Sequence, residues 1–334
     1  MQAPRIDRQT LPPPPGIIGS LRAGFDAITA HISLILMPLG LDLLLWLGPR
    51  LSMNEFVQPV LKDAGSLAAG SGLQPDDIRA ALDLYKQFFT QFNLLVVLRT
   101  FPIGISSLMS GRLPAQSPLG APAVLQVASP GELIGLVFLL TLVGWILGAV
   151  YFRWVAVLVV PEGLLETRTA AGRAVAQTLV YSVVCAVLAW TLGLPVVFVV
   201  YLLFAINTWL GQGVLLLFGF ISLWLVVPLF FSPHGIFVRR QNALASLLGG
   251  FQMTRFTLPS SSLFVLTVVL IGMGLNVLWS MPTADSWLAL VGILGHAFIT
   301  TALLASSFIY YQQMTAWLQT VLARLRASMP TQQA

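Results

Sequence analysis

The side chains that could do chemistry in this chain lie mostly inside apolar stretches. Asp42 stands between leucines, where a carboxylate is costly to desolvate and so marks a candidate contact for an ion, a proton or a polar ligand. His296 lies within another apolar stretch and could titrate there or share a hydrogen bond with Asn276. Arg153 lies near the end of a third and could extend its guanidinium group to the nearest water. The alternative for Asp42 is a structural carboxyl satisfied by hydrogen bonds.

Residue patterns that mark common catalytic sites are missing from the sequence. There is no HExxH, no GxSxG, no Walker loop and no GxGxxG pattern. Three scattered histidines and the single Cys185 do not make a transition-metal site. We therefore expect no catalysis, no metal and no cofactor, and a lipid-modifying enzyme is the weakest of the functional classes that we consider.

Six long apolar stretches must position these side chains. The chain is 57% hydrophobic and only 9% charged, with a mean hydropathy of +0.87. A helix of about 20 apolar residues covers a hydrocarbon core of about 30 Å. Lipid cannot satisfy free backbone groups, so continuous apolar runs predict helices. The sequence thus predicts an all-α integral membrane protein with six transmembrane helices, near 31–48, 133–160, 174–206, 211–232, 262–281 and 286–311.

Two stretches leave the number of spans open. Residues 93–109 are apolar but contain Arg99 and Pro102, so we interpret them as interfacial or packed on the outer face rather than spanning. Residues 174–206 are too long for one upright crossing, since helix rises about 1.5 Å per residue. We expect a kink at Gly193 and Pro195, with a break into two spans as the alternative.

The distribution of basic residues predicts the orientation. Eleven arginines fall on one side of the predicted spans, whereas the short loops near 207–210 and 282–285 contain none. By the positive-inside rule both termini are expected in the cytoplasm, with the protein in the cell membrane. The net charge is +5, and basic residues beside apolar stretches favour anionic lipid head groups over nucleic acid as partners. The candidate head-group contacts are Arg22, Arg168, Arg173, Arg239, Arg240 and Arg255.

A weak internal repeat precedes the odd-numbered spans. Residues 20–25 (SLRAGF) resemble 246–251 (SLLGGF), and 168–173 (RTAAGR) keep only the small residue before glycine. Residues 17–29 and 242–256 also show helical spacing of apolar side chains, as expected of amphipathic helices at a membrane surface. We therefore predict about three short interfacial helices and a threefold repeat of helical hairpins. The alternative is duplication for packing alone.

Two parts lie outside the spans. Residues 1–30 are expected to form a cytoplasmic tail and the first amphipathic helix, ahead of a membrane domain at 31–334. Residues 49–131 are expected to form a helical insertion on the outer side, with one helix at 53–68 and another beginning at Pro75. The second helix carries an apolar and aromatic stripe at Ile78, Leu82, Tyr85, Phe89 and Phe92. The insertion is either a docking face or a cap on its own spans.

Residues at the end of the predicted fourth span and before the fifth show a loose family resemblance. They are the run 228–233 (PLFFSP), the helix 243–247 (ALASL) and the segment 249–251 (GGF). This layout resembles the six-span membrane domain of some glycerophosphodiester phosphodiesterases and related bacterial membrane proteins, over roughly 160–320. The resemblance implies a membrane domain without the phosphodiesterase barrel. We expect a non-catalytic protein that binds lipid or a membrane-protein partner, with a small transporter or permease subunit using Asp42 as the alternative.

Overall fold

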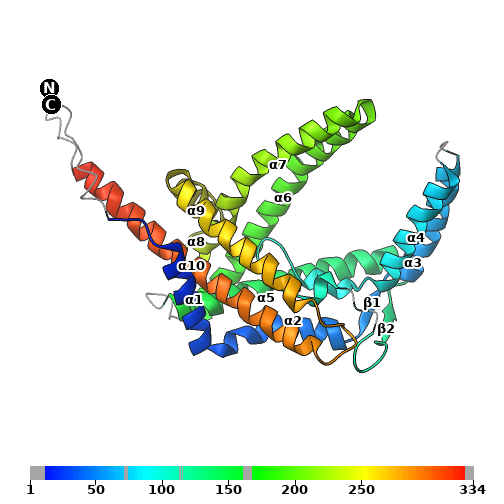
Figure 1. Cartoon of the computed structure of the whole chain (residues 1–334), viewed down its shortest axis with the longest axis horizontal. Helices are drawn as coiled ribbons and strands as arrows, with labels where there is room; N and C mark the ends of the chain where they lie inside the picture. Colours follow the sequence, from blue (N-terminus) through cyan, green and yellow to red (C-terminus); the bar gives the residue numbers. More distant parts are fainter. Residues whose placement is uncertain (1–11, 71–73, 113, 115, 161–167, 328–334) are drawn as a thin grey trace. The chain divides into compact units, whose positions relative to one another are not determined.

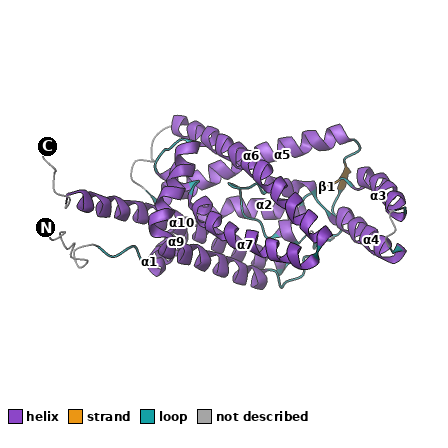
Figure 2. Cartoon of the chain, turned by 90° about the horizontal axis from the view of Figure 1, so that it is seen from above, coloured by secondary structure: helices purple, strands orange, loops and turns teal. Residues whose placement is uncertain are grey.

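A computed structural model describes residues 12–70, 74–112, 114, 116–160 and 168–327, and in these residues the chain is largely helical (Figure 1). The helices are α1 (Ile17–Ala30), α2 (Leu36–Leu47), α3 (Asn54–Ala69), α4 (Pro75–Gln91), α5 (Pro130–Val159), α6 (Arg168–Ile206), α7 (Thr208–Phe231), α8 (His234–Val238), α9 (Ala243–Trp279) and α10 (Ala289–Ala327). Figure 2 shows how little of the chain is strand. The strands β1 (Arg50–Ser52) and β2 (Val124–Gln126) pair in parallel, with Leu51 opposite Leu125.

Among the described residues, five helical segments are long and apolar enough to cross a membrane. They are Pro130–Val159, Ala171–Ile206, Thr208–Val238, Ala243–Trp279 and Ala289–Ala327. A sixth arises if Ile17–Ala30 and Ile32–Leu47 count as one span, although these two helices meet at an angle of 95°. The expectation of a helical, multi-pass membrane protein is therefore confirmed, whereas six spans and the threefold repeat remain predictions.

The chain divides into two compact units. Residues 1–31, 152–272 and 301–334 form the first, and residues 32–151 and 273–300 form the second. Residues 1–11, the start of the predicted cytoplasmic tail, lie outside the described part of the chain.

The first unit is built around a cluster of buried aromatic rings. Phe231 at the end of α7 stacks with Tyr310 of α10, with ring centroids 5.6 Å apart. Tyr310 in turn stacks on Phe264 of α9 at 4.1 Å. All three side chains are fully buried. Offset and tilted ring pairs of this kind stabilise a core beyond their buried area, so they join α7, α9 and α10.

Small residues let α1 approach α10 closely. Ser20, Gly24 and Ile28 form the buried face of α1. A Cβ atom at position 24 would lie 2.6 Å from the backbone nitrogen of Ser306, so only glycine fits there. Ser20 Oγ also donates a hydrogen bond of 3.0 Å to Gln313. The small side chains of the predicted repeat are thus a packing face.

The corresponding residues of α9 pack in the same way. Ser246 and Gly250 are buried, and a Cβ atom at position 250 would lie 2.8 Å from Cα of Ser232. By contrast, Leu244 and Leu248 are 58% and 60% exposed. The large apolar side chains of this segment therefore point away from the first unit, where lipid can cover them. In the third copy, a Cβ atom at position 172 would meet nothing within 4 Å.

A kink divides α9 into the predicted surface segment and the predicted fifth span. The backbone of Thr257 leaves helical geometry at φ −124° and ψ 17°. Pro259 follows two residues later, has no N–H and clashes with the carbonyl four residues earlier. Thr257 Oγ1 donates to the Met253 carbonyl at 2.8 Å. The side chain thus satisfies a carbonyl near the break.

The predicted third span is one uninterrupted helix, α6, with Pro195 inside it. It pairs along its length with α7 (Figure 1). The Asn207 side chain begins α7 by accepting hydrogen bonds from the backbone nitrogens of Trp209 and Leu210, as expected of an N-cap. The large side chains of both helices are mostly exposed, including Trp190 at 66% and Leu216 at 74%. Lipid or a neighbouring protein is therefore the natural surrounding of this hairpin.

In the second unit, residues 93–109 form no long helix. After a short 3-10 turn at Leu94–Leu98, the chain is irregular and packs against the middle of α5. A Cβ atom at Gly144 would lie 2.6 Å from the carbonyl oxygen of Leu98. One at Gly148 would lie 2.9 Å from Cα of Gly104. The close packing against α5 thus covers this irregular backbone.

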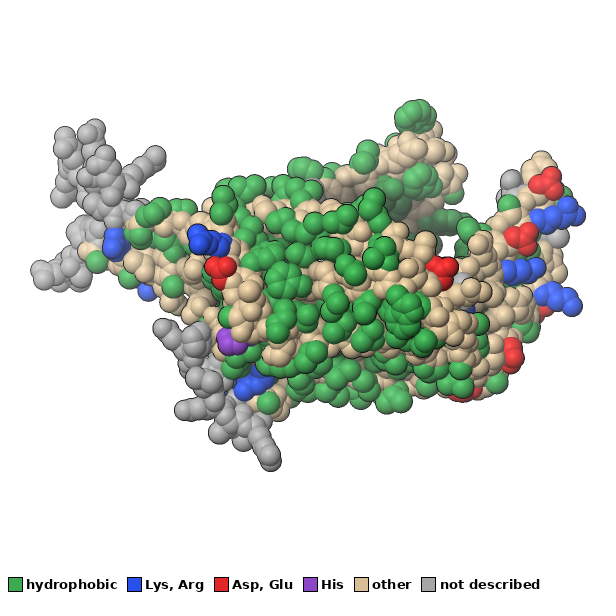
Figure 3. All heavy atoms as spheres, turned by 60° about the horizontal axis from the view of Figure 1, so that its bottom comes forward, with side chains coloured by type: hydrophobic (Ala, Val, Ile, Leu, Met, Phe, Trp, Pro, Cys, Tyr) green, Lys and Arg blue, Asp and Glu red, His purple; other side chains and the backbone are tan. Residues whose placement is uncertain are grey.

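The two outer helices predicted for the insertion are α3 and α4. They form an antiparallel hairpin (Figure 1). Arg50 anchors the base of the hairpin, donating hydrogen bonds to the carbonyl oxygens of Thr90 at 3.3 Å and Pro114 at 2.5 Å. Burial lowers the pKa of this guanidinium group below its ordinary value. Figure 3 shows charged side chains gathered on the hairpin, while hydrophobic side chains cover much of the remaining face in view.

Candidate functional site

Asp42 on α2 is fully buried and engaged by the loop that precedes η4, the 3-10 turn Met109–Gly111. Its Oδ1 accepts hydrogen bonds from Ser107 Oγ and from the backbone nitrogen of Met109. Its Oδ2 accepts a hydrogen bond of 3.1 Å from the backbone nitrogen of Leu108. The carboxylate thus caps a turn that would otherwise leave two N–H groups unpaired. This arrangement agrees with the structural role that the sequence left as the alternative.

Arg99 lies near both this carboxylate and His296 in the second unit. Arg99 donates a hydrogen bond of 2.9 Å to Ser110 Oγ and lies close enough to act electrostatically on Asp42 and on His296. His296 is 8% exposed, and its Nε2 atom has no hydrogen-bond partner among the described residues. Asn276 is exposed, and no hydrogen bond joins it to His296 in the described part of the chain. The structure therefore places Arg99 near both Asp42 and His296 and leaves Asn276 apart.

This polar cluster is closed. Neither Asp42 nor His296 lines the larger cavities found among the described residues. An ion or substrate would need a path to the carboxylate, and each of its two oxygen atoms already accepts at least one hydrogen bond from the neighbouring loop. The geometry holds the loop in place and offers no open ligand position.

A second set of polar residues forms an open basic pocket in the first unit. Arg153 near the end of α5, Arg173 near the start of α6 and Arg240 after α8 all line one small cavity of about 20 Å³. Gln177 and Gln241 complete its polar wall. Arg153 is half-buried, whereas Arg173 and Arg240 are exposed. Among the described lining residues no side chain is acidic, so the cavity carries positive charge.

The start of α9 adds to this positive charge. Gln177 accepts a hydrogen bond of 2.8 Å from the backbone nitrogen of Ala243, the first residue of α9. The first turn of a helix carries a partial positive charge, and Gln177 lies in the wall of the pocket beside it. The side-chain oxygen of Gln241 is buried without a hydrogen-bond partner among the described residues. The pocket thus has cationic donors and one unused polar atom.

The backbone of Arg240 is held in an unusual conformation. Its φ of 51° lies in the left-handed region, which costs a non-glycine residue about 1 kcal/mol. In this conformation the Arg240 carbonyl accepts a hydrogen bond of 3.0 Å from the Arg173 guanidinium group. Strained residues of this kind persist where surrounding contacts hold them, often at binding sites. The strain here brings Arg173 and Arg240 to the same cavity.

The other predicted head-group residues lie elsewhere. Arg22 forms an exposed ion pair with Asp26 at 3.7 Å. Arg239 interacts with the Tyr311 side chain, and Arg255 lies 5.9 Å from the centre of the Phe256 ring. The side chain of Arg168 is outside what the structure describes. Of the six predicted contacts, the structure thus places Arg173 and Arg240 in one pocket and adds Arg153, which the sequence analysis had assigned to an intramembrane site.

His234 is a buried polar residue that the sequence analysis did not select. It is 2% exposed, and its Nε2 atom shares a hydrogen bond of 2.8 Å with Ser307 Oγ. Its ring lies 4.6 Å from that of Phe308. The apolar run on both sides of His234, 228–238, is the signal that could have indicated burial.

Ser307 makes a second hydrogen bond besides the one to His234. Ser307 Oγ donates its proton to the carbonyl oxygen of Leu304 at 2.7 Å. Which of Ser307 Oγ and His234 Nε2 donates in their shared hydrogen bond depends on the tautomer of the His234 ring. The pair fastens α8 to α10.

Comparison with protein-family models, with curated proteins and with solved structures found no match for this chain. The resemblance inferred from the sequence stays a prediction, and the function must be argued from the geometry of these sites.

Proposed function

We propose that this multi-pass membrane protein is a non-catalytic binder of anionic phospholipid, acting as an accessory or scaffold protein in the cell membrane. The observation that carries the proposal is the convergence of Arg153, Arg173 and Arg240 on one small cavity. Guanidinium groups bind phosphate through paired, charge-assisted hydrogen bonds. A phosphate oxygen bound between these three guanidinium groups would accept hydrogen bonds from three separate parts of the chain.

The cavity is too small to enclose a whole lipid head group, which would bind at its opening. A cavity of about 20 Å³ accommodates one water-sized group, so it would take one phosphate oxygen while Arg173 and Arg240 reach the others from outside. The acyl chains would then lie along the exposed apolar side chains of α6 and α9. Leu248 and Phe256, both 60% exposed, offer such a surface.

The position of the pocket along the chain agrees with an inner-leaflet site. Arg153 precedes the end of α5, and Arg173 follows the start of α6, so the two lie at connected helix ends. Arg240 lies between α8 and α9, on the side that the positive-inside rule assigns to the cytoplasm. Glu162 and Glu166, in the connection between α5 and α6, lie outside the described residues.

The alternative, a small transporter or permease subunit with a site near Asp42, has less support. The Asp42 carboxylate accepts hydrogen bonds from Ser107, Leu108 and Met109, and the cluster around it is closed. A binding function needs only the open basic pocket, whereas transport needs a path that reaches the buried polar residues.

Native mass spectrometry of the full chain with defined lipids tests the proposal. We expect phosphatidylglycerol to be retained over phosphatidylcholine, and retention to fall when Arg173 is changed to Gln. Each basic residue near a membrane surface contributes about 1 kcal/mol, so a single change should weaken binding about fivefold. Arg255→Gln is the matched control, because Arg255 lies outside the pocket.

Arg240→Gly is the sharpest variant. Glycine adopts the left-handed conformation freely, so this change removes the side chain while relieving the strained backbone. We expect a folded protein of equal or higher thermal stability that binds phosphatidylglycerol less tightly. Equal retention of the two lipids, or unchanged retention in both pocket variants, contradicts the proposal. Competition by inorganic phosphate alone would show that the pocket binds free anions instead of lipid.

A further inference from the structure

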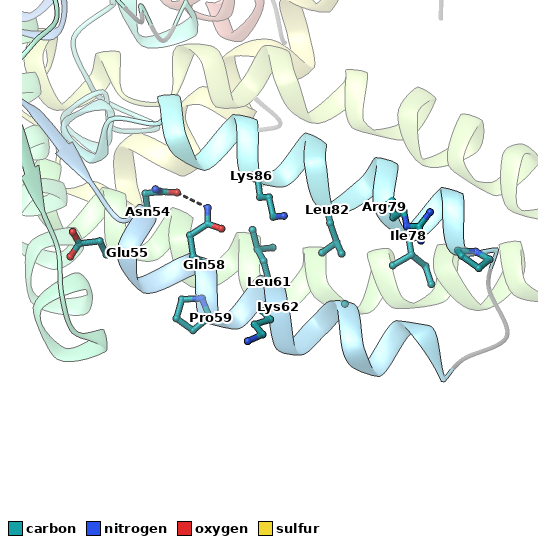
Figure 4. Close-up of a pocket in the computed structure, with 12 residues that line it drawn as sticks. Asn54, Glu55, Gln58, Pro59, Leu61, Lys62, Ile78, Arg79, Leu82 and Lys86 are labelled. Atoms are coloured by element: carbon teal, nitrogen blue, oxygen red, sulfur yellow. Dashed lines mark hydrogen bonds between the residues drawn. The ribbon is translucent and has the colours of Figure 1, made fainter.

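The hairpin of α3 and α4 contains a large groove, and the proposed lipid binding does not use it. The groove has a volume of about 1040 Å³ and runs between the two helices (Figure 4). Leu61 from α3 and Ile78 and Leu82 from α4 line it with apolar side chains. Leu61 is buried at the base of the groove, whereas Ile78 and Leu82 are half-buried along it (Figure 4). Apolar side chains from both helices therefore line the groove.

Charged residues are segregated around this groove. All three basic residues of the segment 54–91, Lys62, Arg79 and Lys86, line it. Of the acidic residues in that segment whose side chains are described, Glu55 lines the groove, whereas Asp63, Asp76 and Asp83 do not. The hairpin has more acidic than basic residues, yet all of its basic side chains line the groove.

The basic residues are available to a partner. Arg79 and Lys86 have ion pairs with Asp76 and Asp83 at 3.5 and 3.9 Å, and all four side chains are more than half exposed. Exposed pairs of this kind contribute little to stability. An incoming carboxylate can therefore replace either aspartate without loss of folding energy.

The spacing of the charges favours a helix as the occupant. Arg79 and Lys86 are seven residues apart on α4, which places them about 10 Å apart, two helical turns, along one wall. A partner helix with acidic residues two turns apart would match both, whereas one lipid head group would need the charges to converge. Groove-to-groove pairing of two copies would bring like charges together.

We infer that the α3–α4 groove binds an amphipathic helix of a protein partner, with the apolar face of that helix on the half-buried Ile78 and Leu82 and its acidic flank on Lys62, Arg79 and Lys86. The added helix would complete a three-helix bundle, a common form of helix-in-groove recognition. The surface lies in the segment that the sequence assigned either to a docking face or to a cap.

The test uses the full chain in nanodiscs of neutral phosphatidylcholine and a fluorescent synthetic helix of about five turns, with leucines on one face and glutamates beside them. A second peptide replaces every glutamate with lysine. Fluorescence anisotropy at low and high salt measures binding. We expect the glutamate peptide to bind and the lysine peptide to bind at least about tenfold more weakly, with salt reducing the difference.

Two variants separate the groove from the rest of the hairpin. Lys86→Glu reverses a charge in the groove and should weaken binding of the glutamate peptide about tenfold or more. Gln87→Glu places a negative charge on a neighbouring exposed residue outside the groove. This variant should have little effect on peptide binding. Circular dichroism of both variants checks that the helices are kept.

Several results would overturn the inference. These are equal binding of the two peptides, a Lys86→Glu variant that binds the glutamate peptide as tightly as the parent chain, and a glutamate peptide that does not bind. Dimerisation of the parent chain that Lys86→Glu abolishes would assign the groove to a second copy. Retention of anionic lipid that depends on Lys86 would assign it to lipid.

Discussion

Asp42 and Ser107 are 65 residues apart in the sequence and share a buried hydrogen bond. Ser107 Oγ also accepts a hydrogen bond of 3.0 Å from the backbone nitrogen of Ser110. The carboxylate on α2 is thus the centre of a network that shapes the turn at 107–110. An acidic residue inside an apolar helix here organises irregular backbone whose buried N–H groups need partners.

The first prediction concerns the stability that Asp42 provides. Asp42→Ala leaves the N–H groups of Leu108 and Met109 without an acceptor, and each unsatisfied buried group costs about 1–3 kcal/mol. We expect a loss of about 2–4 kcal/mol in the free energy of unfolding, and a smaller loss for Asp42→Asn, which keeps one acceptor oxygen. Thermal unfolding in detergent, followed by tryptophan fluorescence, measures both.

Leu36→Ala is the control for this series, because Leu36 lies on the same helix and is 55% exposed. If Asp42→Ala unfolds at the temperature of Leu36→Ala, the structural role is wrong. A stable Asp42→Asn protein that loses a transport activity would favour the permease alternative.

The second prediction concerns the close approach of α1 to α10. Gly24→Ala forces a methyl group against Ser306, whose Cα would lie 2.7 Å from the new Cβ atom. Overpacking of this kind costs about 1–3 kcal/mol. Gly19→Ala, on the same helix with nothing within 4 Å, should be neutral or stabilising by up to about 1 kcal/mol. Thermal unfolding of the two variants side by side checks the contrast, and equal effects would contradict the packing described here.

The third prediction concerns the kink at Thr257. Pro259→Ala restores the missing N–H and removes the ring that clashes with the preceding turn. We expect α9 to straighten, so that spin labels at the exposed positions 248 and 266 move apart. Double electron–electron resonance measures this distance after Cys185, the single native cysteine, is changed to Ala.

Leu263→Ala is the control for the kink, since Leu263 is 54% exposed and lies between the labels. This change should leave the distance between the labels unchanged. An unchanged distance in Pro259→Ala as well would show that packing of Met253 and Thr257 against the core holds the bend, and that the proline does not cause it.

The class of the protein and the extent of most helices could be predicted from local patterns in the sequence. Runs of apolar residues indicate membrane-length helices because lipid exposure acts on each stretch separately. The helix at Pro75–Gln91 was likewise predictable, since proline and acidic residues mark a helix start through local chemistry. Such signals depend on neighbours along the chain, which the sequence contains in full.

The positions of the polar side chains, by contrast, depend on tertiary packing and could not be predicted from the sequence. His234 lies just after the predicted fourth span, and packing against Phe308 and Ser307 buries it. The pocket of Arg153, Arg173 and Arg240 brings together residues from three separate elements. Such contacts arise from long-range packing, in which the close approach of helices and the need to pair buried polar groups decide each partner, and no pattern of neighbouring residues records them.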